Sequence, residues 1–120
     1  MLKKHICKHH AEVCKVFANS LRIEIIEALV ERDRSTTELA EMIGVSQVNI
    51  SQALRMMRER NIVISTRDGN SASHALADPR IKKVFFMMRE MLLDNLQRSG
   101  ELARDVRSNL KSAAEAEGPS

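Results

Sequence analysis

The fold of this chain is decided by residues 35–54, which read STTELAEMIGVSQVNISQAL. The stretch opens with a capping box, because Glu38 follows Ser35 by three residues immediately before an apolar run. Gly44 stands where a helix needs a left-handed C-terminal cap. Ser46 then offers the N-cap of a further helix. The stretch therefore predicts two short helices joined by a tight turn that contains glycine.

The second of these helices has one apolar face and one polar face. Ile50, Leu54 and Met57 recur at helical spacing and predict its buried stripe. The opposite face carries amide, hydroxyl and guanidinium groups, from Gln47, Asn49, Ser51, Gln52 and Arg55. Two short helices with a glycine turn, the second of them polar on its exposed side, are typical of a helix-turn-helix.

A β-hairpin is expected directly after this pair of helices. Residues 62–66 are rich in β-branched side chains, residues 67–70 contain an Asp-Gly turn, and residues 71–76 can return as a second strand. We interpret the hairpin as the wing of a winged helix-turn-helix in a mainly α domain. His74 lies alone in the hairpin and is expected to be structural or solvated.

Helices are also predicted on both sides of this region. One covers about residues 2–18, a second begins with Ser20 as its N-cap, and the last follows Pro79. The last helix is apolar nearly all round, and in so small a domain a second copy of the chain best covers its further side. We expect a winged helix-turn-helix domain over residues 1–98 that forms a homodimer through its first and last helices. Residues 99–120 are expected to be a frayed helix or a disordered tail.

The polar helix has the side chains that read double-stranded DNA. A helix fits the major groove, where the amides of Gln47, Asn49 and Gln52 can pair with adenine. Arginines near its C-terminal end, Arg58 and Arg60, suit the phosphate backbone, and the hairpin tip suits the minor groove. The expected DNA-binding residues are Thr36, Thr37, Ser46, Gln47, Asn49, Ser51, Gln52, Arg55, Arg58, Arg67 and Asn70.

Composition excludes several other classes of function. The net charge is +3, and the aromatic content of 2 % leaves almost no platform for stacking single-stranded bases. No apolar run is long enough for a membrane span, and no export signal precedes the two cysteines, so we expect a cytoplasmic protein with free thiols. No phosphate loop, activated nucleophile or paired carboxylates suggest an enzyme. The alternative is a winged-helix protein-interaction module without DNA binding, which predicts acidic or apolar side chains where amides and arginines stand.

Four segments resemble the ArsR/SmtB-type winged helix repressors. They are residues 17–23 (FANSLRI), 37–41 (TELAE), 45–54 (VSQxxISxxL) and 76–79 (LADP), within a likeness over about residues 14–96. The resemblance implies an obligate homodimer, an inverted-repeat operator, and repression relieved by a metal ion, a metalloid or an oxidant. Two inducer sites of that family lack their ligands here, because residues 35–43 hold no cysteine or histidine and residues 78–98 hold no histidine.

A different group of candidate ligands lies near the N-terminus. Cys7, His10 and Cys14 share one flank of the first helix, and thiolate and imidazole suit a thiophilic metal ion such as zinc. Seven helical residues span about 10.5 Å, too far for an intrachain disulfide, which needs Cα atoms within about 7 Å. A closed site would therefore need ligands from the partner chain or an unwound helix start. Three interpretations stay open: a metal site, a redox-sensing thiol pair, and a buried Cys14 beside solvated histidines.

Overall fold

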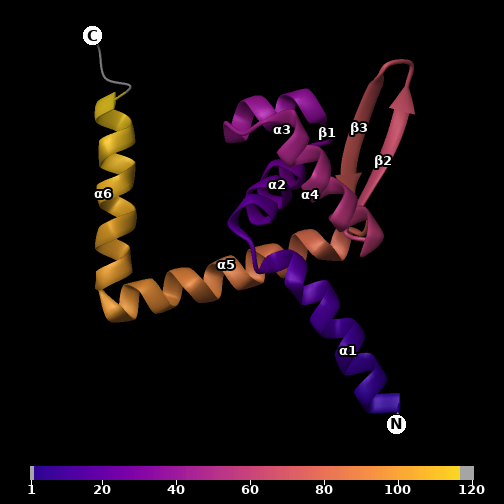
Figure 1. The fold of residues 1–120 in the computed structure, drawn as a ribbon. Coiled ribbons are helices and arrows are strands. Elements are labelled where there is room, and N and C mark those ends of the chain that lie inside the picture. The colour runs from indigo at the N-terminus through magenta and orange to yellow at the C-terminus, as the bar shows by residue number, and fades with distance from the viewer. Residues whose placement is uncertain (1, 117–120) are drawn as a thin grey trace. The chain divides into compact units, whose positions relative to one another are not determined.

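The computed structural model describes residues 2–116, with side chains for residues 3–100 and 104–112. The elements follow one another along the chain as α1 (Leu2–Cys14), η1 (Lys15–Phe17), α2 (Ser20–Glu31), β1 (Arg34–Ser35), α3 (Thr36–Ile43), α4 (Gln47–Glu59), β2 (Val63–Asp68), β3 (Ser71–Leu76), α5 (Pro79–Ser99) and α6 (Glu101–Ala116). This is the mainly helical fold with a β-hairpin that the sequence predicts (Figure 1). The chain divides into two compact units, Met1–Lys83 and Val84–Ser120, and the division falls inside α5.

One apolar core holds the first unit together. Side chains from η1, α2, α3, α4 and the start of β2 are buried there, and removing this apolar surface from water is the main force that stabilises the unit. The largest of these buried side chains are Val16, Ile25, Ile26, Leu39, Ile50, Leu54, Met57 and Val63. The predicted buried stripe of α4 is confirmed.

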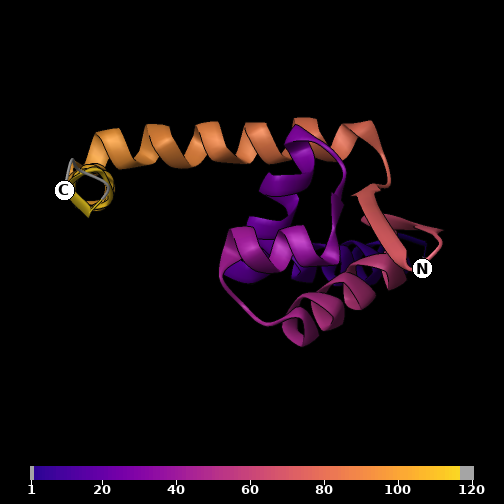
Figure 2. The ribbon, with the colours of Figure 1, turned by 90° about the horizontal axis from the view of Figure 1, so that it is seen from above.

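Local hydrogen bonds fix both helices of the helix-turn-helix. The Ser35 hydroxyl accepts from the Glu38 N–H at 3.1 Å, and the Glu38 carboxylate accepts from the Ser35 N–H at 3.1 Å. Gly44 ends α3 with φ +79°, the left-handed conformation that favours glycine. The Ser46 hydroxyl accepts from the Asn49 N–H at 3.1 Å and begins α4. The three capping predictions are confirmed, and Figure 2 shows α3 and α4 inclined to each other across this turn.

The start of the chain differs from the prediction in two places. The first α-helix ends at Cys14 and continues only as the 3₁₀ turn η1. The N-cap of α2 is Asn19 rather than Ser20, because the extended Asn19 places its side-chain oxygen 3.1 Å from the Arg22 N–H. Arg22 also donates to the carbonyls of Lys15 and Val16, which satisfies backbone oxygens that a continuous helix would have bonded.

The sheet has a third strand that was not expected from the sequence. The two-residue β1 pairs antiparallel with the far edge of β3, and Arg34 lies opposite His74. The hairpin strands pair from Val63 and Leu76 out to Asp68 and Ser71. Strand β2 thus runs further than expected, and Arg67 lies within the strand rather than at the tip of the hairpin.

The second unit is built from the rest of α5 and from α6. Exposed apolar side chains follow α5, namely Val84, Phe86, Met87, Met88, Met91, Leu92 and Leu93. Helix α6 occupies most of the segment for which a frayed helix or disordered tail was expected, and residues 117–120 of that segment lie outside the described residues. Among the helices described, none has the length and apolar character needed to cross a membrane.

Candidate nucleic-acid interface

The outer face of α4 presents the polar side chains predicted for it. Burial of Ile50, Leu54 and Met57 fixes the rotation of the helix about its axis, because residues at this spacing share one face. The side chains of the opposite face are exposed, and they include Gln47, Asn49, Ser51, Gln52, Arg55 and Arg58. The structure thus brings the predicted base-reading amides together on one surface.

Val48 also lies on this exposed surface, although the sequence pattern did not single it out. Its side chain is 65 % exposed in the first turn of α4, between Gln47 and Asn49. An apolar side chain at the start of a recognition helix can contact the methyl group of thymine, the one apolar feature of the major-groove edge. The sequence does contain a signal for this exposure, because position 48 does not belong to the buried stripe of Ile50, Leu54 and Met57.

The three arginines near the C-terminal end of α4 have different surroundings. Arg55 forms an exposed ion pair with Glu59 at 3.5 Å, which contributes little to stability and is easily exchanged for another partner. Arg60 is only 26 % exposed and bonds Glu12 of α1 at 3.1 Å, so its guanidinium is held within the chain rather than offered to a phosphate as we expected. Arg58 is exposed and donates to the Ser65 hydroxyl at 3.4 Å.

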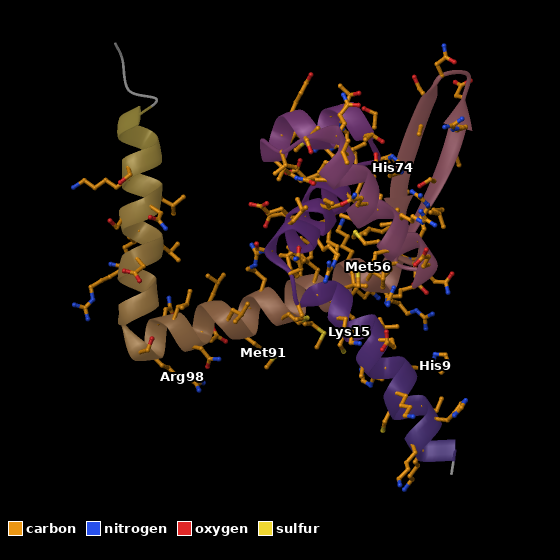
Figure 3. The ribbon with its side chains drawn as sticks, viewed as in Figure 1. His9, Lys15, Met56, His74, Met91 and Arg98 are labelled. Carbon is orange, nitrogen blue, oxygen red and sulfur yellow. The ribbon has the colours of Figure 1, made fainter. Side chains whose placement is uncertain are left out.

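Buried His74 joins three elements around this surface. Its Nε2 lies 2.8 Å from the Thr36 hydroxyl of α3, and its Nδ1 lies 2.6 Å from the Ser65 hydroxyl of β2. Ser65 in turn accepts from Arg58 of α4. Figure 3 shows His74 between the helix-turn-helix and the hairpin. His74 was expected to be either structural or solvated, and its burial and hydrogen bonds give it the structural role.

The surroundings of His74 favour its neutral form. Burial lowers the pKa of the imidazole below its ordinary value of 6.5, and the positive charge of Arg58 lowers it further. The hydroxyl of Thr36 is committed to this imidazole. Thr37, the next residue of α3, is exposed.

The wing residues stand at two different depths of the hairpin. Asn70 is exposed in the turn, next to Gly69 with its φ of +64°. Arg67 is exposed within β2 and pairs across the sheet with Ala72. Since Ser65 and Arg67 are two residues apart, both side chains lie on one face of the strand.

The N-terminal cysteines and histidines lie along an exposed helix. Cys7, His10 and Cys14 are all exposed on α1, so the buried-core interpretation of Cys14 does not apply to the chain taken alone. The rings of His5 and His9 meet edge-on with centroids 5.9 Å apart, and His9 is labelled on α1 in Figure 3. In the described part of the chain, no three histidine, cysteine or carboxylate side chains converge to hold a metal ion.

Comparison with known proteins identifies relatives over most of the chain. The model of the arsR family of bacterial regulatory proteins matches residues 19–65. Rv0081 of Mycobacterium tuberculosis, an HTH-type transcriptional regulator, is 35 % identical over 109 residues, which cover 90 % of this chain and 96 % of that protein. A probable mercury resistance operon repressor of Streptomyces lividans is 25 % identical over 92 residues, which cover 74 % of each protein.

Solved structures have the same fold. The crystal structure of Rv0081 matches with a TM-score of 0.74 and 37 % identity, covering 78 % of this chain and 95 % of that chain. Mb0332 from Mycobacterium bovis, described as a homodimeric winged helix-turn-helix DNA-binding domain, matches with a TM-score of 0.75 and 21 % identity, covering 80 % of this chain and 89 % of that chain. The predicted winged helix-turn-helix fold is confirmed.

The environment of His74 predicts a pH-dependent stability. Because its folded pKa is lowered, the unfolded chain binds the proton more readily, so the stability that His74 provides is complete above about pH 6.5 and is lost as the pH falls. His74→Gln should lower the free energy of unfolding by about 1 kcal/mol at pH 7.5, and the gap to wild type should narrow at pH 5.5. Urea unfolding of both proteins at the two pH values measures this, and a gap that stays constant would contradict it.

Proposed function

Since this chain belongs to the ArsR family of bacterial regulatory proteins, we propose that it is a cytoplasmic repressor that binds an inverted-repeat operator as a homodimer. Family membership makes the chain a transcriptional regulator rather than an enzyme. The observation that carries the proposal is the exposed face of α4, where three amides project from a helix whose start is capped and whose opposite face is buried.

The same face argues against the protein-interaction module. Residues 47–58 hold no aspartate or glutamate, and the exposed side chains there are amides, hydroxyls and arginines apart from Val48. This composition is complementary to the edges of base pairs and to phosphate, whereas a protein-docking helix is expected to present an apolar patch.

We assign the contacts by what each side chain exposes. Gln47, Asn49 and Gln52 read bases in the major groove, and Val48 contacts a thymine methyl group. Ser46, Thr37 and Arg55 contact the phosphates beside them, and Asn70 at the hairpin turn enters the minor groove. Thr36 supports the site instead, because its hydroxyl bonds His74.

Dimerisation rests on the uncovered apolar side chains of α1 and α5. Ile6 of α1 is 61 % exposed, and along α5 Met91 and Leu92 are 65 % and 55 % exposed. Exposed apolar side chains that follow one another along a helix, as they do along α5, mark an interface. A two-fold dimer would present two copies of α4 to half-sites that lie roughly 34–36 Å apart on the duplex.

The release of DNA is assigned to Cys7, His10 and Cys14. These exposed groups lie on the helix whose Glu12 bonds Arg60, the C-cap residue of α4. A ligand or an oxidant that rearranges α1 would therefore act directly on the end of the recognition helix. Because one chain brings no three such ligands together in its described residues, the site we propose takes thiols from both chains of the dimer.

Removal of one base-reading amide tests the DNA-binding assignment. Gln52→Ala should cost about 1–3 kcal/mol on the operator and little on random duplex, because only the operator offers the matching base edge. Fluorescence anisotropy over a salt series, with an operator selected from a random-sequence duplex library, measures both affinities. If wild type shows no salt-dependent duplex binding, the regulator proposal fails. Equal operator affinity of Gln52→Ala and wild type would refute only the contact.

Removal of both thiols tests the proposed release site. Cys7→Ser/Cys14→Ser should bind operator as tightly as wild type but should no longer release it on addition of Zn²⁺ or of a disulfide-forming oxidant. Anaerobic purification, elemental analysis and anisotropy of both proteins give the comparison. If metal content and release are the same in the two proteins, these cysteines have no part in the mechanism.

A further inference from the structure

A pocket of about 240 Å³ lies between α4 and the wing. Its lining includes polar groups from α3, α4 and both hairpin strands, namely Thr36, Ser51, Arg58, Ser65, Arg67 and His74. No acidic side chain is among the residues that line it. Ligand sites for whole small molecules have volumes of roughly 300–1,000 Å³, so this pocket suits a single small group.

The two guanidinium groups of the pocket have no carboxylate partner among the residues that the structure describes. Arg55, Arg60 and Arg80 each form an ion pair with a carboxylate. Neither Arg58 nor Arg67 has a carboxylate partner among the described residues, and the one hydrogen bond of Arg58 is to the Ser65 hydroxyl at 3.4 Å. Two such guanidinium groups beside hydroxyl donors form an anion site, and their planar forks match the oxygens of phosphate.

The register of the hairpin builds this arrangement. Ser65 and Arg67 share one face of β2, and their cross-strand partners are His74 and Ala72. The small side chain of Ala72 lies opposite Arg67, and buried His74 belongs to the lining of the pocket. Because His74 bonds the hydroxyls of Thr36 and Ser65, it holds α3 and the wing at fixed positions around the opening.

We propose that this pocket holds one phosphate group of the DNA backbone between Arg58 and Arg67, with the Ser51 hydroxyl as a further donor. The proposal rests on the DNA-binding function proposed above and adds that one backbone phosphate of the DNA binds in this pocket. A phosphate held by α4 and β2 together fixes the position of the recognition helix along the groove, since phosphate contacts set register without reading sequence. His74 acts through Thr36 and Ser65 and is a positioning residue.

Two charge-removing variants and a matched control test the site. Arg58→Gln and Arg67→Gln should each weaken binding on the order of tenfold, equally on operator and random duplex. Each should also flatten the slope of log K against log salt by about one. Arg80→Gln removes the same charge from a guanidinium that is paired with Asp78 and lies outside the pocket lining. Its slope should equal that of wild type.

A duplex with single neutral phosphates locates the contact. Methylphosphonate at one position of each half-site should weaken wild type most, weaken Arg58→Gln and Arg67→Gln less, and leave the double variant Arg58→Gln/Arg67→Gln almost unaffected, because in each single variant the other arginine still holds the same phosphate. If no single position couples to both arginines, the proposal is overturned. If wild type binds duplex and both variants keep its affinity and salt slope, the pocket proposal alone is overturned. If wild type binds no duplex, the proposed function itself is contradicted.

Titration with inorganic phosphate tests whether the pocket binds a free phosphate ion rather than a phosphate of the DNA backbone. Titration of the DNA-free protein with phosphate, followed by amide NMR, should shift Ser51 and Ser65 only weakly, because one phosphate on a duplex gains from its neighbouring contacts. Saturation at micromolar phosphate, together with no coupling to any backbone position, would overturn the DNA assignment and assign the pocket to a free anion.

Discussion

Burial of one face of α4 in the core determines how the DNA-binding surface is arranged. Ile50, Leu54 and Met57 are inserted into the core, and the helical period then leaves no freedom in where the other side chains point. The Ser46 cap fixes where the helix begins. The same apolar contacts that stabilise the domain therefore aim Gln47 and Gln52 outward, and stability and recognition are two consequences of one packing arrangement.

A polar network completes what the core begins. His74 connects α3 to β2, and Ser65 carries the connection on to Arg58 of α4. A buried imidazole is costly unless both ring nitrogens have partners, and here two hydroxyls supply them. The wing is thereby held beside the recognition helix, so that both can meet the same stretch of duplex. On the other side, Glu12 connects α1 to Arg60 at the end of α4.

What the sequence predicts well depends on local chemistry. The capping box at Ser35, the turn at Gly44 and the start of α4 are set by residues within four positions of one another, and all three were predicted. Strand β1 was not predicted, and His74 was left between a structural and a solvated role, because both depend on residues far apart in the chain, such as Thr36 and His74, which are 38 positions apart. Arg60 illustrates the same limit. Its sequence context suggests a phosphate contact, whereas its guanidinium bonds the carboxylate of Glu12, which is 48 residues away in the chain.

In the proposed complex, two copies of α4 occupy successive major grooves of one operator. Hydroxyl-radical footprinting of the wild-type protein on a duplex selected from a random library tests it most directly. We expect two protected patches, related by the two-fold symmetry of an inverted repeat and centred roughly 34–36 Å apart along the helix axis. A single patch, or protection with no relation to an inverted repeat, would contradict it.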